Sequence, residues 1–115
     1  MNKEEISNWF RSIQLSICND LEAIDGQAQF VETKWDRPEG GGGLTRLLAD
    51  GQIFEKAGVN YSAVHGPIPG FLNMEIKGEA SEFYATGTSI VIHPKSPLVP
   101  IIHFNTRYFE MNNGY

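Results

Sequence analysis

Apolar side chains recur at intervals of three and four over the first 24 residues of the chain. This spacing is typical of an amphipathic helix that buries one stripe of its surface, and Gly26 follows as a stop signal. We therefore predict a helix from Glu4 to about Ile24. Cys18 lies on its buried stripe as a small core residue. The predicted stripe comprises Ile6, Trp9 or Phe10, Ile13, Ile17, Leu21 and Ile24.

Beyond Gly26 apolar and polar residues alternate, which indicates strands. Asp50-Gly51 is a hairpin-type turn signal, and three prolines between positions 94 and 100 interrupt any strand there, because proline cannot continue a ladder. The glycines at 40–43 are predicted to break the chain between the first two strands. The predicted strands cover residues 29–35, 44–48, 59–64, 83–93 and 101–109, and residues 67–80 receive no assignment.

A helix followed by a run of strands predicts an α+β fold, in which the N-terminal helix packs on an antiparallel sheet. The length of 115 residues allows one domain. The composition, 41% hydrophobic and 20% charged, excludes the disordered and fibrous classes.

Charge and cysteine content narrow the function further. The net charge of −5 argues against nucleic acid as a partner, because neutralising phosphates requires a surplus of Lys and Arg. No apolar run approaches the roughly 20 residues of a membrane-spanning helix. The single Cys18 has no internal disulfide partner, which fits a reducing compartment, and the acidic start is not followed by the apolar segment of a signal peptide. We therefore expect a cytoplasmic protein.

The last two predicted strands form a candidate site if they pair across the proline-rich loop with His93 opposite Ile101. Side chains alternate between the two faces of a strand, so this register gathers the polar positions on one side. That face carries Ser89, His93, His103, Asn105 and Arg107. The opposite face carries Ile90, Ile92, Ile102 and Phe104, and is predicted to face the core.

The polar face suits an anionic ligand. Arg107 offers a planar fork that matches a carboxylate, Ser89 and Asn105 add neutral hydrogen bonds, and a neighbouring histidine transfers protons near neutral pH. The alternative is the solvated face of a half-buried sheet.

Four phrases in this order resemble the oxygen-dependent coproporphyrinogen III oxidase family. They are Lys34–Gly43, Asp50–Asn60, Gly87–Pro94 and Val99–Phe109. The resemblance implies that residues 1–115 are the N-terminal portion of a single domain, whose larger antiparallel sheet is flanked by helices. It also implies a homodimer.

The same resemblance implies the oxidative decarboxylation of two propionates of coproporphyrinogen III by O₂. The products are protoporphyrinogen IX, CO₂ and hydrogen peroxide, and no organic cofactor is required. Ser89 becomes a substrate contact, His103 the proton donor, and Asn105-Thr106-Arg107 a substrate-binding tripeptide. In bacterial members His93 and His103 are also ligands of a divalent metal ion such as manganese, together with two histidines beyond residue 115.

Other interpretations remain open at this stage. The chain covers about a third of the family's enzyme, so we expect a fragment that is inactive alone. Two histidines are an incomplete metal site and also suit a metal-free proton shuttle. Arg37 and Arg46 contact propionates or lie on the surface, and His65 is expected in a turn or on the surface. The glycines at 40–43 lack the Gly-Lys-Ser/Thr ending of a nucleotide-binding loop.

Two other classes of function remain as alternatives. One is a non-catalytic sheet domain that binds a porphyrin or another polycarboxylate without converting it. The other is a structural assembly piece that makes contact through an exposed strand edge.

Overall fold

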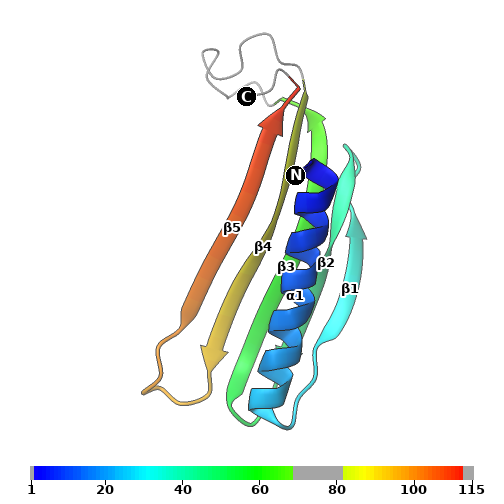
Figure 1. Ribbon diagram of the computed structural model, residues 1–115. Helices are drawn as coiled ribbons and strands as arrows, with labels where there is room; N and C mark the ends of the chain where they lie inside the picture. Colours follow the sequence, from blue (N-terminus) through cyan, green and yellow to red (C-terminus); the bar gives the residue numbers. More distant parts are fainter. Residues whose placement is uncertain (1, 69–81, 113–115) are drawn as a thin grey trace.

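In a computed structural model, one helix lies against one face of a five-stranded antiparallel sheet (Figure 1). The structure describes residues 2–68 and 82–112. The helix, α1, spans Lys3–Asp25. It begins where the Asn2 side chain accepts a hydrogen bond from the N–H of Glu5, 2.9 Å away. It ends at Gly26 in the left-handed conformation (φ 76°), whose N–H donates to the carbonyl of Glu22.

Consecutive strands are neighbours throughout the sheet, in the order β1-β2-β3-β4-β5. The strands are β1 (Val31–Asp36), β2 (Gly41–Ala49), β3 (Phe54–Pro67), β4 (Glu82–Pro94) and β5 (Ile102–Met111). The predicted α+β class is therefore confirmed. Residues 67–80, which receive no assignment from the sequence, lie outside the described residues except at 67 and 68.

The chain does break between β1 and β2 at residues 37–40, but Gly41, Gly42 and Gly43 belong to β2, which corrects the prediction for these three glycines. β2 begins at Gly41, and Gly43 pairs with Trp35 of β1. A Cβ atom at position 43 would lie 2.5 Å from the indole ring of Trp35. The missing side chain therefore lets the indole lie close over β2, a use of glycine that a search for turns does not detect.

The buried stripe of α1 is rotated from the predicted one. Trp9 and Ile24 are each 57% exposed, because the helix turns them away from the sheet. The residues that are buried are Ser7, Phe10, Gln14, Cys18, Leu21 and Asp25. Three of these are polar, so apolar spacing alone could not locate the face. The aliphatic part of the stripe joins a core formed by Cys18, Leu21, Leu48, Phe54, Ala57, Val59, Ile90 and Ile92.

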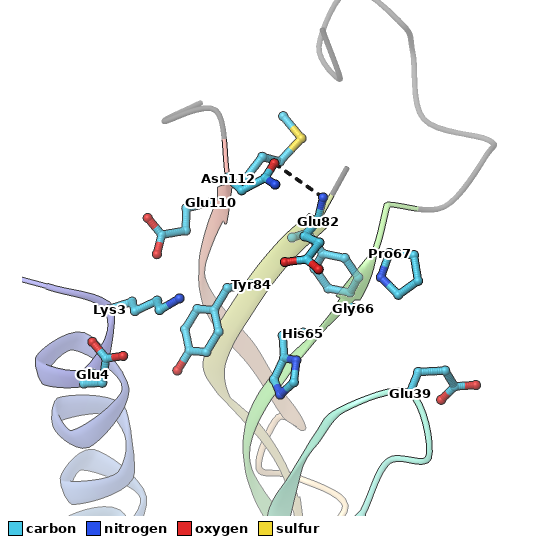
Figure 2. A pocket seen from close by; sticks show the side chains of 12 residues that line it. Lys3, Glu4, Glu39, His65, Gly66, Pro67, Glu82, Tyr84, Glu110 and Asn112 are labelled. Atoms are coloured by element: carbon cyan, nitrogen blue, oxygen red, sulfur yellow. Dashed lines mark hydrogen bonds between the residues drawn. The ribbon is translucent and has the colours of Figure 1, made fainter. Parts of the chain in front are cut away.

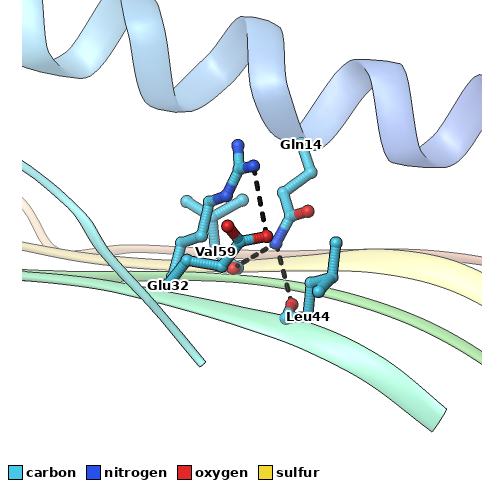
Figure 3. Close-up of polar contacts among 5 residues, drawn as sticks. Gln14, Glu32, Leu44 and Val59 are labelled. Carbon is cyan, nitrogen blue, oxygen red and sulfur yellow. Dashed lines mark hydrogen bonds and ion pairs between the residues drawn. The ribbon is translucent and has the colours of Figure 1, made fainter. Parts of the chain in front are cut away.

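Gln14 fixes the middle of α1 to the sheet (Figure 3). Its side chain is fully buried, and its Nε2 donates to the carbonyl of Leu44 at 2.8 Å and to that of Val59 at 2.9 Å. Thr88 makes a second link, donating from its hydroxyl to the carbonyl of Phe10 at 2.8 Å. These bonds define one orientation of the helix on β2, β3 and β4.

Asp25 fixes the end of the helix to the hairpin between β2 and β3. Its buried carboxylate accepts hydrogen bonds from the backbone N–H groups of residues 27, 28, 52, 53 and 54. The N···O distance is 3.0 Å in four of these bonds. The bonds from Ala28 and Phe54, more than the others, hold the pKa of Asp25 far below its ordinary value, against the opposing effect of burial. The predicted Asp50-Gly51 turn forms here, with the N–H of Gly51 donating to the carbonyl of Phe54.

Only part of the predicted apolar face is covered. Ile90 and Ile92 of β4 are buried, whereas Ile102 and Phe104 of β5 are 51% and 54% exposed. Helix α1 packs on β3 and β4 and does not extend over β5. The prediction of a core face was therefore wrong for the β5 pair. Over residues 2–68 and 82–112, no helix is long and apolar enough to cross a membrane.

Candidate functional site

The predicted register between the last two strands is confirmed. Val91 pairs with His103, Ser89 with Asn105, and Gly87 with Arg107. Alternation places these side chains on the face of the sheet away from α1, which we name the open face. Four residues predicted for the site therefore share it: Ser89, His103, Asn105 and Arg107.

Thr106 is the predicted substrate contact that the fold separates from the others. It pairs with Thr88, whose hydroxyl bonds to α1, so its side chain lies on the helix-covered face. Its own hydroxyl is buried, with no hydrogen-bond partner among the described residues. Any contact of Thr106 with a ligand on the open face would have to involve its backbone.

His93 joins the open face at the end of β4. It is half-buried and pairs with Lys56 of β3. His103 pairs with Val91, two residues before His93, which makes the two histidines diagonal neighbours. Such neighbours have Cβ atoms about 7 Å apart or less, within the reach of long side chains.

The ladders extend this face across all five strands. One row of paired residues carries neutral hydrogen-bonding side chains: Thr33, Thr45, Asn60, Ser89 and Asn105. The adjacent row has small residues between an indole and a guanidinium: Trp35, Gly43, Ser62, Gly87 and Arg107. Sequence reasoning missed the members from β1, β2 and β3, because their alignment depends on three ladders that no local pattern specifies.

The charge of the open face is opposite in sign to that of the whole chain. One part of the open face is formed by residues 56–67 of β3 and by the residues of the other strands that are aligned with them. This part carries Lys56, Arg107, His93 and His103, and it carries no Asp or Glu. Alternation instead places the carboxylates of the strands, such as those of Glu32 and Glu110, on the α1 face. A chain of net charge −5 therefore presents a locally cationic surface, which suits a polycarboxylate ligand.

The end of the sheet near the start of α1 is unsuited to the same ligand. A cavity of about 760 Å³ lies there (Figure 2), lined in part by Glu4, Glu39, Glu82 and Glu110. Four carboxylates repel a polyanion. His65 also lines this cavity; it is exposed, as expected, but lies in β3 rather than in a turn.

The two other candidate arginines lie outside the paired rows of the open face, although the guanidinium of Arg37 lies 5.7 Å from the ring centre of Phe83, which alternation places on this face. Arg37 donates to the carbonyl of His65 at 2.6 Å and pairs with Glu39 at 3.6 Å. Arg46 pairs with Glu32 at 3.4 Å, on the α1 face of the sheet. Both guanidinium groups therefore serve contacts within the fold.

Comparison with known proteins identifies the family of the chain. The family model described as coproporphyrinogen III oxidase matches residues 5–114. The chain belongs to this family. It is 52% identical over 100 residues to the oxygen-dependent coproporphyrinogen-III oxidase of Prochlorococcus marinus (strain NATL2A), covering 85% of this chain and 29% of that protein. It is 50% identical over 107 residues to coproporphyrinogen-III oxidase 1, chloroplastic, of Arabidopsis thaliana, covering 87% of this chain and 28% of that protein.

The chain thus spans less than a third of the length of these coproporphyrinogen oxidases. Within the part that the structure describes, no group of three or more His, Cys, Asp or Glu side chains is placed to hold a metal ion. His93 and His103 are two candidate ligands, fewer than the three or four protein side chains of a usual metal site.

Cys18 lies in the core between α1 and the sheet. Its thiol is 2% exposed, and burial raises its pKa, an effect that nearby Arg46 partly opposes. A buried thiol with a raised pKa is a poor nucleophile. This agrees with the interpretation of Cys18 as a core residue.

Proposed function

We propose that this chain is the N-terminal portion of an oxygen-dependent coproporphyrinogen III oxidase, a haem-biosynthesis oxidoreductase, and that its open face binds the tetracarboxylate substrate. The observation that carries the proposal is the placement of Arg107, Asn105, Ser89 and His103 on one face of the sheet, where the paired strand residues from Lys56 onward include no Asp or Glu. Family membership adds the reaction, which is the conversion of two propionates of coproporphyrinogen III to the vinyl groups of protoporphyrinogen IX.

Each propionate loses CO₂ and two hydrogens, and O₂ accepts the two electrons and two protons to become hydrogen peroxide. In this scheme O₂ is the co-substrate and no organic cofactor takes part. Arg107 holds a propionate through its planar fork. Asn105 and Ser89, two residue pairs along the ladder from Arg107, add neutral hydrogen bonds that orient it.

His103 is the proposed proton donor. It lies two residues from Asn105 along the same face of β5, so its imidazole adjoins the bound side chain. A placed acid or base of this kind contributes typically about 10²–10⁴ in rate. His93 and His103 would also be two ligands of a divalent cation such as manganese, and their diagonal arrangement fits that role in part. When bound, the ion would supply positive charge beside the substrate carboxylates.

The assembly and the location are further parts of the proposal. We take the complete enzyme to be a homodimer, on the family resemblance. A cytoplasmic location is supported by the unpaired, buried thiol of Cys18. The plastid is the alternative, since the name of the Arabidopsis relative places that protein in the chloroplast.

A chimera tests the function. In it, this chain replaces the matching segment of the Prochlorococcus marinus (strain NATL2A) oxidase, and formation of protoporphyrinogen IX is followed by fluorescence after oxidation to the porphyrin. We expect turnover by the chimera, none by the isolated chain, and a fall in kcat of at least about 100-fold for His103→Ala. His65→Ala, at an exposed histidine outside the open face, is the matched control.

A folded chimera without activity would contradict the oxidase assignment. An active chimera in which His103→Ala behaves like His65→Ala would contradict only the proton-transfer role. A chimera that binds coproporphyrinogen tightly without converting it would favour the alternative of a non-catalytic porphyrin-binding sheet.

A further inference from the structure

Asn60 lies at the centre of the open face. Its strand, β3, is the middle one of the five, and Asn60 pairs with Thr45 on one side and with Ser89 on the other. Asn105 follows Ser89 in the same row. Asn60 therefore adjoins the proposed substrate contacts, although it comes from a different part of the sequence.

The carboxamide of Asn60 has no hydrogen-bond partner among residues 2–68 and 82–112, although the residue is half-buried. Its amide atoms are not among the buried polar atoms that lack a partner, as the Oε1 of Gln14 on the other face is, so solvent reaches them. An amide that water reaches can exchange that water for a ligand group without breaking a bond within the protein. The amide of Asn60 is thus free to bind a molecule that lies on the open face.

The distance from Asn60 to Arg107 suggests which part of a substrate it would meet. The two residues are two strands apart and two positions apart along the ladder, which corresponds to about 12 Å between Cα atoms. The shortest path between them crosses Ser62, Gly87 and Ser89, whose small side chains leave room above the sheet. A propionate held at Arg107 would therefore place the attached macrocycle, rather than a second carboxylate, above Asn60.

We propose that Asn60 is a specificity-determining substrate residue, whose carboxamide oxygen accepts a hydrogen bond from a pyrrole N–H of the porphyrinogen ring. The inference rests on the proposed function and extends it from the carboxylate periphery to the ring. The chemistry favours an amide here, because Lys and Arg have no acceptor, whereas the oxygen of Asn accepts without adding negative charge. The central nitrogens of a porphyrinogen present N–H donors to such an oxygen.

The test uses the same chimera with two substitutions. Asn60→Leu keeps the approximate size and removes the acceptor, whereas Asn60→Asp keeps the acceptor. We expect Asn60→Leu to raise KM for coproporphyrinogen III about tenfold with kcat changed less than about threefold, as for the loss of one hydrogen bond. Asn60→Asp should stay within about threefold of the parent KM. Thermal unfolding midpoints of both variants show whether the fold is retained.

The results separate the two proposals. An inactive parent chimera would contradict the oxidase function, and with it the basis of this inference. An active parent with an unchanged KM in folded Asn60→Leu would overturn the role of Asn60 alone. A KM higher in Asn60→Asp than in Asn60→Leu would also overturn it, because the amide would then face a propionate. If Asn60→Leu does not fold, Asn60→Ala replaces it with the same expectation.

Discussion

Gly87 of β4 lies opposite Arg107 of β5, and a Cβ atom at position 87 would lie 3.1 Å from the Cα of Arg107. The same atom would also clash with the carbonyl oxygen of Thr106. The absence of a side chain at Gly87 therefore lets β5 approach closely at the position of the candidate carboxylate-binding residue. The spacing of the two strands and the position of the guanidinium are linked.

Gly87→Ala is predicted to displace β5. Backbone atoms rather than a flexible side chain oppose the added methyl, so we expect a loss of roughly 1–3 kcal/mol in the free energy of unfolding and a higher KM in the chimera. Gly58→Ala is the control, since its methyl would meet only a side-chain carbon of Leu47 at 3.4 Å. Denaturant unfolding and steady-state kinetics measure both effects. Equal stability of the two variants would contradict the account of the β4–β5 spacing.

The side chains that share one face of β4 and β5 could be predicted from the sequence because two local signals are present there. The proline-rich loop set the turn, and strict alternation assigned Ser89, Asn105 and Arg107 to one side. Thr106 shows the limit of carrying over a motif, since a contiguous tripeptide in a strand cannot direct all its side chains to one face. The place of Asn60 beside Ser89 could not be predicted, because its neighbours depend on pairing between strands that are distant in the sequence.

The helix shows a different limit. Hydrophobic spacing found α1 and nearly its ends, but the burial of Gln14 and Asp25 follows from backbone groups that the sheet and the hairpin present. These groups exist only after tertiary folding. A polar residue in a core is therefore found by accounting for unsatisfied backbone hydrogen bonds, which requires the structure.

Gln14→Ala is predicted to destabilise the protein more than its size suggests. The substitution removes two hydrogen bonds and leaves the carbonyls of Leu44 and Val59 buried without that donor. We expect a loss of roughly 2–4 kcal/mol in the free energy of unfolding, measured in urea. Gln29→Ala, at an exposed glutamine, is the control and should change it by less than about 0.5 kcal/mol. A similar small change for Gln14→Ala would show that the two bonds are not needed.

The hydrogen-bonded carboxylate of Asp25 should make the stability of the fold sensitive to acid. Its pKa is lower in the folded protein than the ordinary value near 3.9, so its contribution to stability is full above that value and is lost as the pH falls toward the folded pKa. The temperature midpoint of unfolding should therefore decrease as the pH is lowered from about 5 to about 2. Asp25→Asn should be less stable at pH 7 and show a smaller fall. Asp20→Asn, at an exposed carboxylate of the same helix, should retain the parent's fall; identical pH profiles for all three proteins would contradict this role.

The central claim is that the open face recognises the carboxylates of the substrate, and the KM of Arg107→Ala in the chimera tests it most directly. Arg11→Ala, at an exposed arginine of α1, removes the same charge from the other side of the sheet. We expect Arg107→Ala to raise KM for coproporphyrinogen III at least about tenfold, as for the loss of a charge-assisted bond, and Arg11→Ala to leave it unchanged. Equal KM values for the two folded variants would contradict it.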